Sequence, residues 1–180
     1  MLGSLHKRGF FCRKNSAGFT ALEIVVVLII LSVFSTFAIL SYSSYRRQAR
    51  IKNGAQSVNS TITTARALAI NQNAGFEVSI DIENGYFWID KLDRQGAVLK
   101  PKFMGINWLP ESVLFAEVRK NNYSYYSGIV TILFLPNGTS EYTSIYLIGE
   151  NMDGGVSENY FTIRVYPSTG LSHIYKNQRK

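Results

Sequence analysis

The chain has few of the residues on which catalytic and metal sites usually depend. Its 180 residues include one cysteine, Cys12, and two histidines, His6 and His173. A single cysteine excludes an intrachain disulfide, and no second histidine or cysteine lies at the spacing of zinc ligands. The sequence contains neither a nucleophile-elbow pattern nor a phosphate-binding glycine loop. We therefore predict no enzyme, no metal centre and no cofactor, and we expect His173 to be a surface residue of a strand.

Acidic residues are almost absent from the first 75 positions, although the net charge of the whole chain is only +7. Residues 1–18 carry four basic side chains and no acid, and residues 41–75 carry five basic side chains and no acid. Residues 76–180 carry ten basic and eleven acidic side chains. A basic face is the usual mark of nucleic-acid binding, so the near-neutral C-terminal part argues against such a partner. The C-terminal Lys176, Arg179 and Lys180 leave phosphate contact open, but a solvated tail is favoured.

The longest apolar run, FTALEIVVVLIILSVFSTFAIL, contains one charge, Glu23, and no proline or glycine. As a helix, residues 19–40 are about 33 Å long, which matches the ~30 Å hydrocarbon core of a bilayer. We predict a transmembrane helix here rather than a core helix of a soluble protein. A secretory signal peptide is the other interpretation, but the run exceeds the usual ~7–15 residues and no small-x-small cleavage site follows it.

Residues 41–75 are amphipathic and continue the helical pattern. Apolar residues recur at steps of three and four: Ile51, Ala55, Val58, Ile62, Ala65 and Ala69. We expect the helix to end at NQNAG, with Gly75 in the left-handed conformation. Four basic residues follow the predicted membrane segment, where we expect them to contact lipid phosphates or acidic neighbours: Arg46, Arg47, Arg50 and Lys52.

Residues 76–180 change to the alternating pattern of strands and predict six to eight antiparallel strands, with the helix covering one face. The turn residues Asn84-Gly85 predict a hairpin between Phe76–Ile82 and Tyr86–Asp90. The turn Pro136-Asn137-Gly138 predicts a second hairpin. The remaining expected strands are Ile129–Leu135, Thr143–Ile148, Ser112–Val118, and Tyr160–Tyr166 turning at Pro167-Ser168-Thr169-Gly170 into Leu171–Tyr175.

The segment Glu150–Glu158, ENMDGGVSE, contains three acids and two glycines. Such a loop has the oxygen ligands that calcium prefers, but it lacks their regular alternation. A solvated loop is favoured, and calcium binding is left open.

The N-terminus resembles the class III signal of type IV pilins and type II secretion pseudopilins. The matching residues are Gly18, Phe19, Thr20, Glu23 and the apolar stretch Ile24–Leu40. The resemblance implies that a prepilin peptidase cuts between Gly18 and Phe19, removes residues 1–18 as a leader and N-methylates Phe19. It also implies that Glu23 attracts the new amino terminus of a neighbouring subunit during assembly.

The C-terminal part is similar to the H-type minor pseudopilins and related minor pilins. The similarity rests on Phe76–Tyr86, on ILFLPNG at Ile132–Gly138 and on Ser168-Thr169-Gly170. It implies an α+β, pilin-like fold, in which one long N-terminal helix packs on an antiparallel β-rich head. Two departures stand out. Leu40 replaces a proline common in the family, which leaves a kink open. Some DNA-binding minor pilins have a Gly-Arg-x-Arg ending, whereas here Gly170 is followed by Leu171-Ser172-His173.

The resemblance implies a minor pseudopilin of a type II secretion pseudopilus, with a minor type IV pilin for DNA uptake, adhesion or motility as the alternative. A membrane-tethered enzyme would need a polar pocket that the sequence does not show. We expect the N-terminus in the cytoplasm, one pass through the inner membrane and the head, residues 76–180, in the periplasm. Expected partners are other pilin subunits, the peptidase and the inner-membrane assembly platform. Residues expected in the filament core are Ile24, Val27, Leu28, Leu31 and Phe34.

Overall fold

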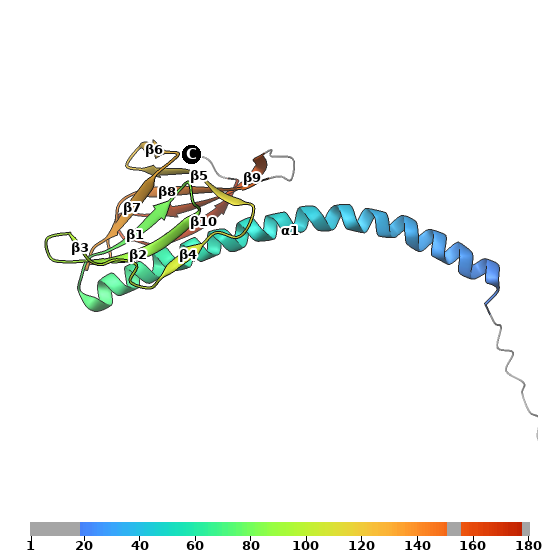
Figure 1. Ribbon diagram of the computed structural model, residues 1–180, viewed down its shortest axis with the longest axis horizontal. Coiled ribbons are helices and arrows are strands. Elements are labelled where there is room, and N and C mark those ends of the chain that lie inside the picture. The colour runs from blue at the N-terminus through green and yellow to red at the C-terminus, as the bar shows by residue number, and fades with distance from the viewer. Residues whose placement is uncertain (1–18, 151–155, 178–180) are drawn as a thin grey trace, which may run out of the picture. The chain divides into compact units, whose positions relative to one another are not determined.

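The computed structural model describes residues 19–150 and 156–177, and for residues 36–44 and 156–159 it describes the backbone alone. The chain divides into two compact units, Met1–Tyr42 and Ser43–Lys180. The described residues form one helix, α1 (Ala21–Gln72), followed by ten strands (Figure 1). The first unit contains the beginning of α1. The second contains the rest of α1 and every described strand.

Within the second unit, α1 presents one buried stripe to the strands. The six residues of the predicted stripe are all fully buried: Ile51, Ala55, Val58, Ile62, Ala65 and Ala69. Their spacing of three and four residues places them on one face of the helix. The amphipathic pattern in the sequence is therefore confirmed as the face on which the head packs.

The C-terminal end of α1 differs from our expectation. Asn73, with φ of 48°, takes the left-handed conformation, and Gly75 has no positive φ. The amide of Asn73 bonds the carbonyl oxygen of Ile70 at 3.4 Å, and the amide of Ala74 bonds that of Ala69 at 3.3 Å. These two bonds make a Schellman motif, which asparagine tolerates better than most residues other than glycine. The prediction for Gly75 is wrong because the helix ends two residues earlier.

One sheet contains five strands in the order β3-β2-β1-β7, with β4 also paired to β2. The predicted first hairpin is confirmed: β1 pairs antiparallel with β2, from Phe76 opposite Lys91 to Asp81 opposite Tyr86. Gly85 in the connecting turn has φ of 70°. The strands are β1 (Phe76–Asp81), β2 (Tyr86–Leu92), β3 (Val98–Lys100), β4 (Ile106–Trp108) and β7 (Ile129–Phe134).

The other sheet has the order β10-β9-β8-β5-β6. The predicted final hairpin is confirmed by the antiparallel pairing of β9 with β10, in which Val165 lies opposite Ser172. Three strands were not predicted, β3, β4 and β6, because three residues are too few to show an alternating pattern. The strands of this sheet are β5 (Val113–Lys120), β6 (Tyr123–Tyr125), β8 (Thr143–Glu150), β9 (Val156–Val165) and β10 (Ser172–Lys176).

The predicted hairpin of β7 with β8 is wrong, because the two strands belong to different sheets. β7 pairs with β1, and β8 pairs with β5 and β9. The turn after β7 closes locally through the amide of Leu135 and the carbonyl oxygen of Thr139, 3.0 Å apart. The first five residues of β8 are all buried. A strand buried on both faces needs a central position, and only the second sheet offers β8 a neighbour on each side.

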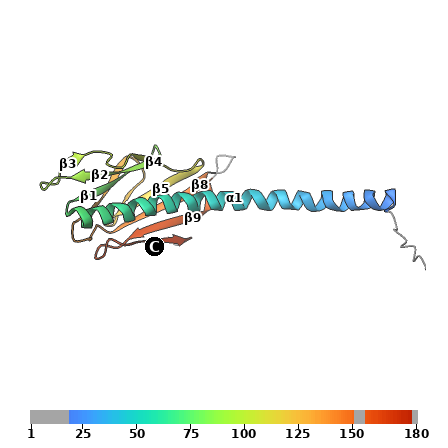
Figure 2. The ribbon, with the colours of Figure 1, turned by 90° about the horizontal axis from the view of Figure 1, so that it is seen from below.

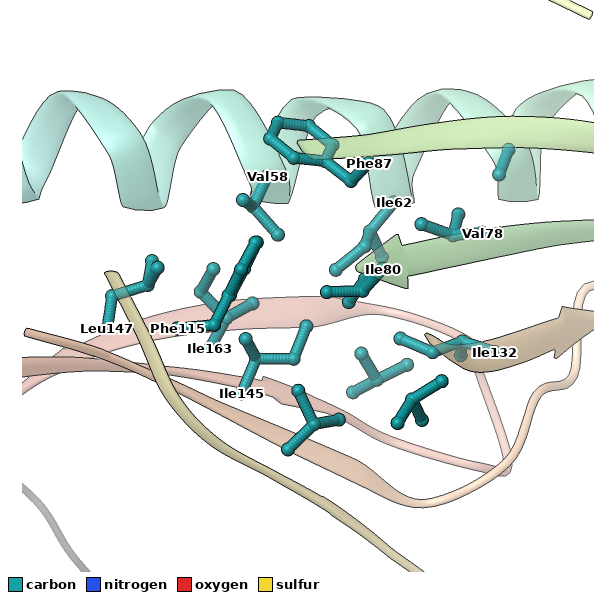
Figure 3. Close-up of a cluster of buried hydrophobic side chains, with 14 of the residues drawn as sticks. Val58, Ile62, Val78, Ile80, Phe87, Phe115, Ile132, Ile145, Leu147 and Ile163 are labelled. Atoms are coloured by element: carbon teal, nitrogen blue, oxygen red, sulfur yellow. The ribbon is translucent and has the colours of Figure 1, made fainter. Parts of the chain in front are cut away.

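The core lies between α1 and the two sheets. Figure 3 shows Val58 and Ile62 from the helix pointing toward Val78 and Ile80 of β1 and Ile145 of β8. The later part of α1 crosses both sheets on the same side, as a second view makes clear (Figure 2). The helix therefore joins two sheets that share no strand.

Candidate functional site: the start of α1 and the turns that meet its end

Thr20 begins the helix and Glu23 lies in its first turn. The backbone amide of Glu23 donates to Oγ1 of Thr20 at 3.2 Å, and the amide of Ile24 donates to the carbonyl oxygen of Thr20 at 3.2 Å. Thr20 is thus the N-cap, and the spacing from Thr20 to Glu23 is that of a capping box. A carboxylate in the first turn also interacts favourably with the helix dipole. The Thr-x-x-Glu spacing therefore has a local physical cause in addition to the intersubunit role that the resemblance implies.

The carboxylate of Glu23 faces out of the chain. Its side chain is exposed, and the two described ion pairs, Arg119 with Glu117 and Lys120 with Glu141, do not involve it. Phe19 is 77% exposed, while Gly18 lies outside the described residues. Cleavage before Phe19 and its N-methylation therefore stay predictions.

The first unit of the chain presents apolar side chains on every side of α1. The five predicted core residues have exposed fractions from 48% at Val27 to 68% at Phe34. Val25, Val26, Ile29 and Ile30, which point in other directions, are also exposed. The hydroxyls of Ser32 and Ser35 donate hydrogen bonds to the carbonyl oxygens of Ile29 and Leu31 at 2.7 and 2.8 Å. Their donors are therefore satisfied within the helix and do not need water. A helix that is apolar all round is suited to an apolar environment rather than to water.

Residues 36–40 of the predicted membrane segment 19–40 lie outside the residues whose side chains are described. Among the described residues, we find no helix that combines the length and the apolarity needed to cross a bilayer. The membrane-spanning assignment stays a prediction.

The four basic residues after the predicted membrane segment belong to the second unit. Arg46 and Lys52 are exposed, and Arg47 and Arg50 are half-buried. A Cβ on Gly149 would lie 2.9 Å from Cδ1 of Ile51 and 3.6 Å from Cγ of Arg47, so glycine at this point of β8 lets the helix approach. The contacts of these four residues with lipid phosphates or acidic neighbours stay predictions.

Two glycine turns meet the same helix residue, a feature that our sequence analysis missed. Gly138, in the turn after β7, and Gly170, between β9 and β10, have φ of 81° and 60°. Nε of Arg66 donates to the carbonyl oxygen of Thr169 at 2.6 Å, and the amide of Ser140 bonds the carbonyl oxygen of Pro167 at 3.0 Å. Arg66 is the one charged residue between positions 53 and 75. A single charge in an otherwise uncharged stretch of the helix was the feature of the sequence that could have indicated this contact.

The buried acids of the head are satisfied within the chain. Asp90, 4% exposed, accepts hydrogen bonds from Ser79, from the indole of Trp88 and from the amide of Lys102, at 2.6 to 2.9 Å. Glu117, 1% exposed, pairs with Arg119 at 3.0 Å, and its hydrogen bond and charge raise the pKa of that guanidinium. Both carboxylates are therefore engaged in holding strands and loops.

The described residues contain no group of three His, Cys, Asp or Glu side chains that could hold a metal. His173 is exposed on β10, as predicted, and its ring packs edge-on against Tyr166 with centroids 5.9 Å apart. Most of the loop considered for calcium, Glu150–Glu158, lies outside the described residues.

No protein-family description matches the chain. No curated protein matches it either. The solved structures are more informative. The minor pseudopilin EpsH from the type 2 secretion system of Vibrio cholerae superimposes with a TM-score of 0.53 and 13% identity, over 72% of this chain and 99% of that one. The chain has a pilin-like fold.

A crystal structure of EpsH also gives a TM-score of 0.54 at 13% identity, over 73% of this chain and 97% of that chain. The type IV minor pilin FimU of Pseudomonas aeruginosa gives 0.51 at 12% identity, over 75% of this chain and 95% of that chain. Because these identities are low, the likeness establishes the fold. It confirms the predicted α+β, pilin-like architecture.

Proposed function

We propose that this pilin-like protein is a minor pseudopilin, a structural subunit of a type II secretion pseudopilus that assists export of folded proteins. The observation that carries the proposal is the exposed Glu23 in the first turn of a helix that is apolar all round, joined to a pilin-like head. The protein acts by packing and charge, and its expected partners are other pilin or pseudopilin subunits, a prepilin peptidase and an inner-membrane assembly platform.

The role of Glu23 follows from its energy in lipid. An ionised carboxylate in a membrane helix costs roughly 2.5–3.5 kcal/mol on insertion scales. The amino group that cleavage creates at Phe19 of a neighbouring subunit is a cation that can offset this cost. A pair of unit charges 4 Å apart is worth about 4 kcal/mol at an effective dielectric of 20. The cost of placing Glu23 in lipid is therefore offset only when a neighbouring subunit brings its amino terminus beside Glu23. This favours assembly with the subunits in that one axial register.

N-terminal mass spectrometry of the membrane-extracted protein tests the proposal directly. We expect a chain that begins with methylated Phe19 and lacks residues 1–18. A chain that keeps Met1 in cells with an active prepilin peptidase would contradict membership of the assembly pathway.

The second candidate is a minor type IV pilin, and the likeness to FimU favours it as much as the likeness to EpsH favours a pseudopilin. The two differ in what the deletion strain loses. A pseudopilin deletion stops export of folded proteins, whereas a pilin deletion stops pilus-dependent motility, adhesion or DNA uptake. Because residues 76–180 carry almost no net charge, we expect no strong salt-dependent DNA binding by the protein.

A further inference from the structure

β7 is the edge strand of its sheet, and on the side away from β1 its last residue, Phe134, forms an isolated antiparallel bridge with Ser140, while the rest of the strand pairs with no further strand among the described residues. In an antiparallel pair, alternate residues direct their amide and carbonyl groups to the partner strand and away from it. Thr131 and Leu133 are the residues of β7 that direct these groups away from β1. The carbonyl oxygen of Thr131 accepts a hydrogen bond from Nζ of Lys120 at 2.8 Å, and the amide of Leu133 donates to Oε2 of Glu141 at 3.3 Å. β7 pairs with β1 alone among the described strands (Figure 1).

Lys120 and Glu141 occupy the position of a missing neighbour strand. Their charged groups lie 2.7 Å apart, with the side chains 21% and 32% exposed. One supplies a donor and the other an acceptor to the edge, as a backbone would. Because a partly exposed ion pair adds little to stability, an incoming strand can displace it at small cost.

A cleft of about 850 Å³ lies beside this edge, lined by Lys120, Thr131, Leu133 and Glu141 of the edge and by Glu77 of β1. Glu77 lies opposite Leu133, is half-buried and has no ion pair among the described residues. Burial raises its pKa, as do the charges of Asp90 and Glu141, against the opposite effect of Lys120. Of the other carboxylates that line the cleft, Glu141 pairs with Lys120 and Asp93 accepts hydrogen bonds from the amides of Gln95 and Ala97 at 2.8 Å, whereas Glu77 lacks a dedicated cation.

Apolar surface continues along the same edge. Ile129 is 60% exposed and Leu135 is 43% exposed. With Thr131 and Leu133 they alternate along β7 on the side that is not packed against the core, because the buried residues of the strand are Val130, Ile132 and Phe134. An added strand would cover these side chains while it bonds the edge.

We propose that the free edge of β7 binds an extended segment of a partner protein, which adds to the sheet as a strand and places a lysine or arginine beside Glu77. Strand addition of this kind takes affinity from main-chain bonds and specificity from a side-chain pocket. Two copies paired through β7 would bring Glu77 no cation, since Ile129–Phe134 contains no basic residue. The inference concerns the head and stands for either proposed function.

The test uses the full chain in detergent micelles and a fluorescent peptide of sequence TVTVKVTV, with TVTVQVTV for comparison, followed by anisotropy. We expect the lysine peptide to bind more tightly than the glutamine peptide. Thr131→Pro removes an outward amide and no bond to β1, so we expect it to weaken binding by about tenfold while the melting curve keeps its cooperativity. Lys120→Met, which uncaps the edge, should strengthen binding by about threefold.

Glu77→Gln should remove the preference for the lysine peptide. Glu83→Gln is the matched control, because Glu83 is an exposed acid in the turn after β1 and does not line the cleft. Binding that is unchanged in folded Thr131→Pro, or a lysine preference that persists in Glu77→Gln, would overturn the proposal. So would self-association of the chain, detected by light scattering, that Thr131→Pro abolishes while neither peptide binds, since the occupant would then be a second copy.

Discussion

The carbonyl oxygen of Gly138 lies where a side-chain carbon on Gly170 would have to be. Two turns 32 positions apart in the sequence therefore touch backbone to backbone, and the side chain of Arg66 lies against Gly170 from the helix, with Cδ 3.2 Å from that same carbon position. This contact joins the end of β7, the β9–β10 turn and α1 in one place.

Gly170→Ala should destabilise the head strongly, because the methyl group collides with Gly138 and φ of 60° is unfavourable for alanine. We expect a loss of about 2–4 kcal/mol in the free energy of unfolding, measured with urea. Gly96→Ala is the control, since Gly96 has φ of 84° and open space around it. It should lose about 1 kcal/mol from the backbone conformation alone. Equal losses at the two positions would mean that the turn contact is not tight.

Arg66→Ala should lower the free energy of unfolding by about 1–2 kcal/mol, because it leaves the carbonyl oxygen of Thr169 without its 2.6 Å donor and removes the stem beside Gly170. Arg66→Met keeps most of the stem and should lose less. Thermal melts of the three proteins, recorded by circular dichroism, measure the difference. Identical melting temperatures for Arg66→Ala and the parent would exclude a stabilising role for this contact.

The end of α1 gives a paired prediction. Asn73→Gly should stabilise the protein by about 0.5–1 kcal/mol, since glycine adopts the left-handed conformation without steric cost. Gly75→Ala should change the free energy of unfolding by less than about 0.5 kcal/mol, because Gly75 has no positive φ and the nearest atom to the new Cβ, Cβ of Leu92, would be 3.4 Å away. Urea denaturation of both variants measures the two changes. If Gly75 were instead the left-handed residue that ends the helix, Gly75→Ala would lower the free energy of unfolding and Asn73→Gly would leave it nearly unchanged.

Acid should weaken the first hairpin through Asp81. Burial acts to raise the pKa of Asp81, but hydrogen bonds from Asn84 at 2.9 Å and from Tyr86 outweigh it and hold the pKa below its ordinary value of 3.8. A lowered folded-state pKa stabilises the protein above that ordinary value, and the stabilisation is lost as pH falls through the folded value. Asn84→Ala should make stability depend less on pH below 4, measured as the urea midpoint at pH 7 and pH 3. Parallel pH curves for parent and variant would contradict this.

Glu23→Gln separates the two roles of this residue. Glutamine serves the capping box as glutamate does, so the helix should form as in the parent, measured by circular dichroism in detergent. It has no charge to attract the amino terminus of a neighbour, so co-purification with other pilin subunits should fall by at least tenfold, because an interaction of about 4 kcal/mol corresponds to about a thousandfold in affinity. Normal co-assembly of Glu23→Gln would refute the charge mechanism.

Elements whose signals are local could be predicted from the amino-acid sequence. The buried stripe from Ile51 to Ala69 follows from helical spacing, and the first hairpin follows from Asn84-Gly85 between alternating runs. In each case the residues that decide the structure lie within a few positions of one another. Periodicity and turn chemistry are then sufficient to predict it.

The choice of neighbouring strands, by contrast, depends on long-range packing and could not be predicted from the sequence. The turn Pro136-Asn137-Gly138 is compatible both with a hairpin and with a crossing between sheets, and β8 joins the second sheet because it is buried on both faces and needs two partners. The same long-range packing brings Arg66 to Gly170 and leaves β7 as an open edge beside Glu77. The physical reason is that strand pairing and side-chain packing depend on residues far apart in the chain, whose meeting has no local pattern.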